Sequence, residues 1–273
     1  MSSHHGRKPV DPQVVVAEVV RTKQVTPHMM RVTLGGLDRF SALGYDQWFR
    51  LFLQRPGQDV LRPPTRSSEW GWYLQYLATP KSRRPWVRNY TVRAARLDLG
   101  EIDVDFVLHA DAEGRTGPAA DFATTARSGD TVGLLDQGAS YDPQHDHDWT
   151  LLVGDETALP AVAGICESLP ADARGTAVIE VPTADDQQDF RAPAGLEVRW
   201  VARDETTGAD AVPGQAALAE VCGLTLPDGV GSAYAAGEAG LATGVRRHLV
   251  AEGMPKTHIT FLGYWRHGRA ASS

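Results

Sequence analysis

The chain has 273 residues, of which 42% are hydrophobic and 22% charged, so it is long enough for two domains that each bury a core. Its net charge of −7 and pI of about 5.7 exclude the usual nucleic-acid-binding domain, whose pI lies above about 9. Its two cysteines, Cys166 and Cys222, stand in unrelated contexts and exclude both a disulfide framework and a thiolate metal site, so no metal is expected.

Residues 1–9 do not form a recognised targeting segment. They include basic and histidine side chains, but the apolar stretch of a signal peptide does not follow them. No apolar run in the chain approaches the roughly 20 residues that a membrane-spanning helix requires. We therefore expect a soluble protein without a membrane span that stays in the cytoplasm.

The first half of the chain has the pattern of short β-strands. These segments are rich in β-branched or aromatic residues, and turns that contain glycine or proline separate them. They cover residues 14–20, 30–34, 48–53, 90–93, 102–108 and 131–134. Several short strands with such turns favour a closed antiparallel barrel. We predict a six-stranded barrel domain over residues 1–140.

Positive charge is concentrated in one part of this predicted barrel. The segment from Arg50 to Arg93 holds nine basic residues and two acidic ones, a local excess of seven positive charges. Residues 149–273, in contrast, hold 9 basic and 16 acidic side chains, and this difference, 9 − 16 = −7, equals the net charge of the chain. A solvated loop is the commonest origin of a basic cluster. As a functional site in an acidic protein, the cluster favours a compact anionic ligand over nucleic acid.

One helix is expected within the barrel domain, over residues 117–126. Pro118 suits the first helical turn, and Asp121 is favoured at the positive end of the helix dipole. The free backbone N–H groups at such a helix start can hold a phosphate. We interpret the polar segment 136–148 as a linker, and the histidines within it as solvated rather than metal-binding.

After the linker, strands alternate with helices, which is typical of a parallel sheet with crossover helices. No G-x-G-x-x-G motif follows the first of these strands, and Asp155 and Glu156 place carboxylates where a pyrophosphate would approach a glycine loop. The alternation of strands and helices over residues 149–273 thus predicts a nucleotide-binding-type α/β domain. The missing glycine motif and the two carboxylates mean that the residues alone do not indicate a nicotinamide site. Strands are expected over residues 149–153, 176–181, 196–201, 232–236 and 257–262, and helices over 157–168, 213–221 and 241–251.

The sequence contains no phosphate loop, no H-E-x-x-H zinc helix and no G-x-S-x-G nucleophile elbow. The best remaining candidate is the cluster Arg88-x-Tyr90-Thr91. An arginine fork can hold a pyrophosphate, a tyrosine ring can pack against a flat flavin ring, and a threonine hydroxyl can bond to the edge of that ring. Strand alternation places Arg88, Tyr90 and Val92 on one side, and Thr91 and Arg93 on the other. By itself, the cluster is weak evidence, because an aromatic strand with flanking arginines is more often an ordinary barrel surface.

Five segments, in this order along the chain, resemble signatures of the siderophore-interacting proteins, a family of the ferredoxin-reductase-like superfamily. The order and the spread of the matches make the combination specific. The resemblance implies an antiparallel FAD-binding barrel followed by a parallel-sheet, NAD(P)H-binding-type α/β domain. The five segments are Arg88-Asn89-Tyr90-Thr91-Val92-Arg93, Leu108-His109 followed by Gly117-Pro118-Ala119-Ala120-Asp121-Phe122-Ala123, Gly154-Asp155-Glu156-Thr157-Ala158-Leu159-Pro160, Ala236-Gly237-Glu238-Ala239, and Gly263-Tyr264-Trp265-Arg266-His267-Gly268.

The resemblance also implies roles for individual residues. Tyr90 and Thr91 are the expected catalytic residues, because they would lie against the reacting flavin ring. Lys81, Arg84 and Arg266 are expected to line a basic mouth that attracts an anionic ferric chelate. The residues expected to bind FAD are Arg88, Tyr90, Thr91, Val92, Arg93, His109, Gly117, Ala119 and Ala120. Those expected to bind cofactor in the second domain are Asp155, Thr157, Ala158, Gly237, Glu238 and Trp265.

The activity implied is the transfer of electrons from NADH or NADPH through FAD to a ferric siderophore. Reduction to iron(II) weakens the hold of hard oxygen donors and releases the iron. Two other interpretations stay open. One is a general flavin reductase with another acceptor, such as a ferredoxin that docks on the basic segment, and the other is a non-catalytic carrier of flavin or siderophore. We expect a monomer with no nucleic-acid partner.

Overall fold

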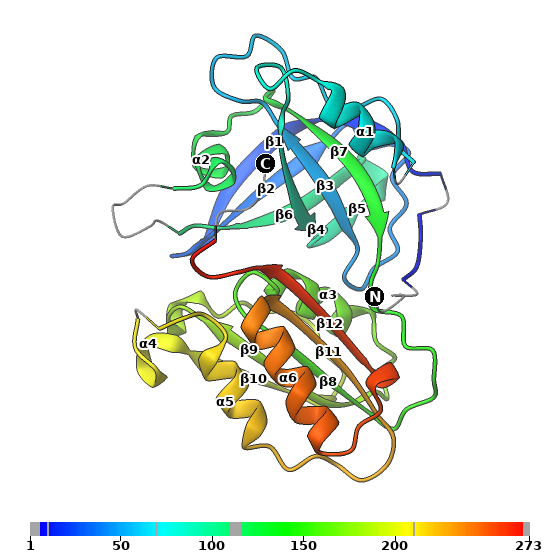
Figure 1. Cartoon of the computed structure of the whole chain (residues 1–273), viewed down its shortest axis with the longest axis vertical. Coiled ribbons are helices and arrows are strands. Elements are labelled where there is room, and N and C mark those ends of the chain that lie inside the picture. Colours follow the sequence, from blue (N-terminus) through cyan, green and yellow to red (C-terminus); the bar gives the residue numbers. More distant parts are fainter. Residues whose placement is uncertain (1–5, 10, 69, 110–115, 210, 270–273) are drawn as a thin grey trace. The chain divides into compact units, whose positions relative to one another are not determined.

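The computed structural model describes residues 6–9, 11–68, 70–109, 116–209 and 211–269. The chain divides into two compact units (Figure 1), one running from Arg7 to Ala139 and one beginning at Ser140. We call them the N-terminal unit and the C-terminal unit. Among the helices of the described residues, none combines the length and the apolar character needed to cross a membrane.

The N-terminal unit is built on a seven-stranded sheet in the order β4-β3-β7-β1-β2-β6-β5, and every neighbouring pair is antiparallel. Alternate side chains of these strands point inward and form the core, as Val32 and Leu34 of one strand and Val104 and Phe106 of another illustrate. The strands are β1 (Val14–Thr26), β2 (Met29–Gly35), β3 (Trp48–Leu53), β4 (Trp86–Thr91), β5 (Ala94–Arg96), β6 (Glu101–Val107) and β7 (Thr131–Gly138).

The predicted antiparallel β domain is confirmed, but the prediction of six strands that close into a barrel was wrong in its strand number and in its closure. The sheet has seven strands, and its two edges, β4 and β5, are consecutive in the chain. At Val92 and Arg93 the chain changes partner: the Val92 amide donates to the Gln47 carbonyl (2.8 Å) and the Arg93 amide to the Asp103 carbonyl (2.8 Å). The bent segment through Val92 and Arg93 therefore pairs with β3 before the bend and with β6 after it. The sheet is curved like a barrel, but its edge strands β4 and β5 do not pair with each other to close it.

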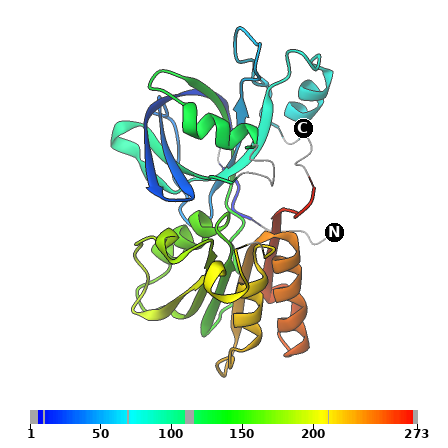
Figure 2. The same cartoon turned by 90° about the vertical axis from the view of Figure 1, so that its left-hand side faces the viewer.

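Two α-helices accompany this sheet. Helix α2 (Pro118–Thr125) lies where the sequence predicted it and adds Ala119 and Ala123 to the core. Helix α1 (Gly71–Ala78) was not predicted, because its sequence lacks a side-chain cap and charged end residues. It stands out from the sheet (Figure 2, cyan) and buries Trp72 and Tyr76. A short 3₁₀ turn, η1 (Leu97–Leu99), joins β5 to β6.

The C-terminal unit confirms the predicted parallel sheet, in the strand order β10-β9-β8-β11-β12. Residues 136–138, expected at the start of the linker, instead extend β7. The strands are β8 (Trp149–Gly154), β9 (Arg174–Val181), β10 (Gly195–Ala202), β11 (Gly231–Glu238) and β12 (Ile259–Trp265). The helices are α3 (Leu159–Ser168), α4 (Arg203–Thr206), α5 (Gln215–Cys222) and α6 (Ala239–Ala251), with 3₁₀ turns η2 (Ala184–Asp186) and η3 (Lys256–His258).

Side-chain alternation along β8 sets the positions of these helices. Leu151 and Val153 face the core that α5 and α6 complete. Gly154 faces α3, and a Cβ atom added there would lie 2.9 Å from Cβ of Ala158 and 3.2 Å from Cγ2 of Val162. Because the strands are parallel, the loops that follow β8, β11 and β12 emerge at the same edge of the sheet. Three of the family-like segments lie at this edge, where β8, β11 and β12 end.

Candidate functional site

Tyr90 is the central aromatic residue of the candidate flavin site in the N-terminal unit. Its half-buried ring packs against Phe106 of β6, with ring centroids 4.2 Å apart. Burial raises the pKa of the Tyr90 hydroxyl well above its ordinary value, and the positive charge of Arg88 opposes that rise. Arg88 therefore acts on Tyr90 through its charge, and Tyr90 stays a neutral phenol at neutral pH.

A row of aromatic rings connects this strand to helix α2. Phe106 contacts Tyr90 on one side, and its ring centroid lies 5.9 Å from that of Phe122 of α2 on the other. Residues that are distant in the sequence, on β4 and α2, thereby share one part of the N-terminal unit. This arrangement brings the two expected FAD-binding segments to the same region of the fold.

The start of α2 has the properties of a phosphate site. Gly117 is its N-cap in an extended conformation, and no side chain caps the first turn. A Cβ atom added at Gly117 would meet nothing within 4 Å, so the space beside Gly117 is open. Pro118 occupies the first helical position, and Ala119 and Ala120 are buried behind it. N–H groups without a side-chain cap, beside this open space, fit the pyrophosphate of a dinucleotide.

The other residues expected at the flavin occupy different environments. Thr91, Val92 and Arg93 are all buried, with exposed fractions of 7%, 8% and 8%. Val92 belongs to the barrel core. His109 is exposed and lies two residues beyond the end of β6. These four roles stay predictions.

The three residues expected at the basic mouth are not brought together within either unit. Lys81 and Arg84 belong to the N-terminal unit, whereas Arg266 belongs to the C-terminal unit. Lys81 and Arg266 are exposed. The Arg84 guanidinium caps the end of α1, donating to the Leu77 carbonyl (2.7 Å) and to the Thr79 carbonyl (3.0 Å). Arg84 therefore has a structural task beside its predicted one.

Asp155, directly after β8, ties together the carboxyl ends of three strands. Its side chain is fully buried. Oδ1 accepts from the backbone amide (2.9 Å) and the hydroxyl (2.5 Å) of Thr157. Oδ2 accepts from the Glu238 amide at the end of β11 (2.6 Å) and from Nε1 of Trp265 at the end of β12 (3.3 Å). Four of the residues expected in this domain's cofactor site thus form one hydrogen-bonded group.

Gly237 allows the Asp155 carboxylate to reach this position. Its φ of +121° lies in the region that favours glycine, and an added Cβ would lie 2.5 Å from the carboxylate of Asp155. Ala158 is buried against Gly154, so it shapes the packing behind the loop. Glu238 caps α6 by accepting from the Gly240 amide, and it also accepts from the His267 amide (3.1 Å).

Burial also changes the protonation of this group. Burial, the larger cause, and the neighbouring carboxylate of Glu156 together raise the pKa of Asp155 to about 7. The hydrogen bonds from Thr157 and the Glu238 amide act in the opposite direction. Asp155 therefore exchanges its proton near neutral pH.

A buried ion network beside Asp155 was not found by sequence reasoning. Arg203 forms a bidentate pair with Glu156 (3.1 and 2.8 Å) and a further bond to Glu180 of β9 (2.7 Å). Glu180 is fully buried and also accepts from the amides of Gly214 (2.8 Å) and Ala217 (2.9 Å). The available signal was a glutamate within the apolar run at the end of strand β9, between Ile179 and Val181.

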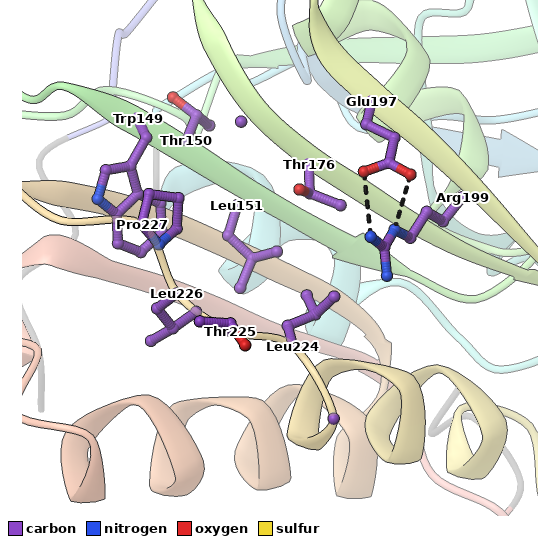
Figure 3. Close-up of a pocket in the computed structure, with 12 residues that line it drawn as sticks. Trp149, Thr150, Leu151, Thr176, Glu197, Arg199, Leu224, Thr225, Leu226 and Pro227 are labelled. Atoms are coloured by element: carbon purple, nitrogen blue, oxygen red, sulfur yellow. Dashed lines mark hydrogen bonds and ion pairs between the residues drawn. The ribbon is translucent and has the colours of Figure 1, made fainter.

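A hollow of about 370 Å³ lies at the opposite edge of this sheet (Figure 3), where β8 and β9 begin. Trp149, Thr150 and Thr176 line it, beside the ion pair of Glu197 and Arg199. Ligands of open α/β sheets bind at the carboxyl ends of the strands. The edge that carries Asp155 is therefore the better candidate for a cofactor site.

Comparisons with known proteins indicate the same family for both units. A model described as a siderophore-interacting FAD-binding domain matches residues 18–141, and one described as siderophore-interacting protein matches residues 147–268. The uncharacterized protein Rv2895c of Mycobacterium tuberculosis is 37% identical over 267 residues, covering 92% of this chain and 90% of the relative. A solved siderophore utilization protein from T. fusca superimposes with a TM-score of 0.80 and 29% identity, covering 98% of each chain.

Two similar proteins carry names that describe a reaction. The ferric vibriobactin reductase ViuB of Vibrio cholerae is 28% identical over 260 residues, covering 92% of this chain and 89% of the relative. The NADPH-dependent ferric-chelate reductase of Escherichia coli is 27% identical over 252 residues, covering 90% of this chain and 91% of the relative.

Proposed function

Because the chain belongs to the siderophore-interacting protein family, we propose that it is an FAD-dependent reductase that passes electrons from NAD(P)H to ferric siderophores. The observation that carries this proposal is the convergence of two segments in the N-terminal unit. The aromatic row from Tyr90 to Phe122 joins strand β4 to the open start of α2 at Gly117. A flat ring system and a pyrophosphate, the two ends of a flavin cofactor, match these two features.

In this proposal, each element of the N-terminal unit has a separate task. The first turn of α2 and the Arg88 guanidinium hold the pyrophosphate, since both present N–H donors and positive charge. The Tyr90 ring, fixed against Phe106, supports the flat ring. Thr91 lies in the wall behind it. Bound FAD would link a two-electron hydride donor to the one-electron reduction of iron(III).

We propose NADPH or NADH as the electron donor, received at the edge of the C-terminal sheet. The name of the E. coli relative supports NADPH. In this proposal, Asp155 orients Trp265 and Glu238 without contacting the donor, because all four of its hydrogen bonds go to the protein. Thr157 and Trp265, both half-buried, present the surface that the donor meets.

The substrate we propose is an anionic ferric chelate, as the name of ViuB suggests for that relative. Exposed Lys81 and Arg266 are the residues best suited to attract it, since the Arg84 guanidinium also caps α1. Attraction between charges of this kind weakens as salt is added. Replacing Lys81 and Arg266 by alanine should raise the KM for anionic chelates and flatten its salt dependence.

The test is the visible spectrum of the purified protein, followed by trapping of iron(II) with NADPH and NADH as donors and several ferric siderophores as acceptors. Reduced ferredoxin serves as the alternative donor, and gel filtration tests the expected monomer. We expect bound FAD and donor-dependent iron(II) release. Protein that takes up no FAD, or whose flavin reduces no chelate with any donor, contradicts the proposal.

Gly117→Ala sharpens this test. The position has an ordinary φ of −79° and open space, so the variant should melt at the temperature of the parent. Its methyl group would occupy the space assigned to the pyrophosphate, and FAD affinity should fall about tenfold or more, a loss of about 1.4 kcal/mol. Unchanged FAD affinity would remove the start of α2 from the site.

A further inference from the structure

Helix α1 carries a stripe of large apolar side chains on its outer face. We call Trp70, Tyr73, Leu74 and Leu77 the α1 stripe. Their exposed fractions are 70%, 40%, 59% and 46%. The spacing of three and four residues aligns them along one side of the helix. Exposed apolar side chains that cluster in this way mark an interaction surface, whereas scattered ones need no explanation.

The exposure of the stripe is fixed by the packing of the opposite face. Trp72 packs edge-on against Phe52, with ring centroids 6.0 Å apart, and Tyr76 belongs to the same buried cluster. The Gln75 side chain accepts from the amides of Thr65 (3.0 Å) and Arg66 (3.1 Å) and holds the preceding loop against the helix. The stripe is therefore the outward side of an anchored helix.

Basic residues precede and follow α1 in the chain, although α1 itself has no charged residue. Between Leu61 and Trp86 the sequence holds five basic residues and one acidic residue, Glu69, an excess of four positive charges. The four exposed basic residues of this segment are Arg62, Arg66, Lys81 and Arg83. The loops before and after α1 supply them, so they flank both ends of the helix.

The form of this surface narrows the choice of partner. Helix α1 stands clear of the sheet in Figure 2, and the side chains of the stripe are exposed, so the stripe is an outward-facing surface, whereas small ligands need a concave site. Tryptophan, tyrosine and leucine between cationic side chains are the composition of helices that lie in the interface of a bilayer. Basic residues beside them attract anionic lipid headgroups.

We infer that the α1 stripe and its flanking basic residues dock the protein reversibly on the surface of a bilayer that contains anionic lipid. The apolar side chains enter the headgroup region, and the cations of Arg62, Arg66 and Arg83 meet lipid phosphates. Helix α1 has eight residues, about 12 Å of length, so the attachment is peripheral and reversible. None of the residues of the α1 stripe, nor Arg62, Arg66 or Arg83, is among those assigned to the flavin and donor sites proposed above.

Vesicle sedimentation tests the inference with the full chain loaded with FAD. Vesicles of phosphatidylcholine alone are compared with vesicles that contain about 30% phosphatidylglycerol, because anionic headgroups carry the electrostatic part of the attraction. We expect sedimentation with the anionic vesicles only, weakened at least threefold when salt is raised from about 0.05 to about 0.5 M. Equal binding to both vesicles, or none to either, overturns the inference.

Leu74→Ser with Leu77→Ser is the diagnostic variant. Its matched control is Leu97→Ser with Leu99→Ser, since these two leucines of η1 are 55% and 59% exposed in the same unit. We expect binding of the α1 variant to fall about tenfold and that of the control to stay within about twofold of the parent. Melting temperatures equal to the parent's establish that both variants fold. Equal losses in both variants, or no loss in either, overturn the inference.

The remaining arms test the charge and the tryptophan separately. Arg62→Glu with Arg83→Glu should reduce binding at least as much as added salt does, whereas Lys23→Glu, at an exposed position on β1, should not. Vesicles should shift the tryptophan emission of the parent to shorter wavelength, and Trp70→Phe should remove most of that shift.

An acidic protein that binds the stripe while anionic vesicles do not also overturns the inference. None of these measurements needs turnover, so they fail independently of the proposed reductase activity.

Discussion

At the residue scale, the contacts of Asp155 explain why particular residue types stand around it. A carboxylate with four protein hydrogen bonds leaves little room beside it, and Gly237 lies against it in a backbone conformation that side chains rarely adopt. Trp265 supplies an indole N–H to the same group. The G-D-E-T, G-E-A and G-Y-W segments thus meet in one closely packed, hydrogen-bonded group around Asp155.

Gly237→Ala should destabilise the protein more than Gly253→Ala. Both glycines have positive φ, +121° and +92°, so both alanines carry backbone strain of about 1–3 kcal/mol. An added Cβ at Gly253 meets nothing within 4 Å, whereas at Gly237 it collides with the Asp155 carboxylate. Urea denaturation measures both free energies of unfolding. Equal losses in the free energy of unfolding would show that the protein accommodates the added Cβ at position 237 without a further loss of stability.

Asp155→Asn should change how stability depends on pH. Because burial raises the pKa of Asp155 from 3.8 to about 7, the folded state keeps a proton that the unfolded chain loses across this range. The parent's free energy of unfolding therefore loses a contribution as pH rises from about 4 to about 7. Asparagine has no such proton.

The test is urea denaturation of parent and Asp155→Asn protein at pH 5, 6, 7 and 8. At pH 5 the variant should be less stable than the parent by about 1–3 kcal/mol, because the amide nitrogen of asparagine cannot accept the hydrogen bonds that a carboxyl oxygen accepts. That deficit should shrink as pH rises to 8. The charged neighbours, Glu156 and Glu238, are the same in both proteins. A deficit that stays constant with pH contradicts the raised pKa.

At the element scale, the buried network of Arg203 holds separate parts of the C-terminal unit together. Glu156 lies after β8, Glu180 lies in β9, and Arg203 begins α4. The amides of Gly214 and Ala217 bring α5 to the same glutamate. Helix α5 is thereby placed by hydrogen bonds as well as by apolar packing.

Arg203→Met should cost about 3–5 kcal/mol, because it leaves two buried carboxylates without their cation. Arg199→Met is the matched control, since Arg199 also pairs with two glutamates but on the surface. Exposed pairs of this kind contribute about 1 kcal/mol or less. Thermal denaturation of both variants measures the difference, and similar losses would contradict the network's importance.

The elements that sequence reasoning missed share a physical cause. Helix α1 has no charged residue and no cap, and its order comes from Trp72 and Tyr76 packing on the sheet. Strand β5 was also not predicted, and its separation from β4 follows from a change of partner at Val92 and Arg93. Both depend on contacts with distant segments, which local pattern does not contain.

At the scale of the whole molecule, the two units differ in architecture and in charge. The antiparallel sheet carries the basic segment, and the parallel sheet belongs to the acidic half of the chain. In the function we propose, the first holds FAD and the second receives the donor. The two tasks are then separable by substitution.

Trp265→Phe should affect the donor and leave FAD binding intact. The substitution keeps an aromatic ring but removes the N–H that donates to Asp155 (3.3 Å). We expect FAD content equal to the parent's and a KM for NADPH raised about threefold to tenfold, equivalent to about 0.6–1.4 kcal/mol. Steady-state iron(II) release at several NADPH concentrations measures it. A loss of FAD with an unchanged KM would contradict the division of tasks.

The sequence by itself determined the order of the two folds, because the alternation of apolar side chains and the turn residues are local properties. It also supplied the family, since five segments between Arg88 and Gly268 match in order. Only the tertiary structure decided what those segments do together. The Asp155 hydrogen bonds, the Arg203 network and the row from Tyr90 to Phe122 join residues far apart in the chain. Burial and hydrogen bonding in three dimensions, which a linear pattern does not encode, select these partners.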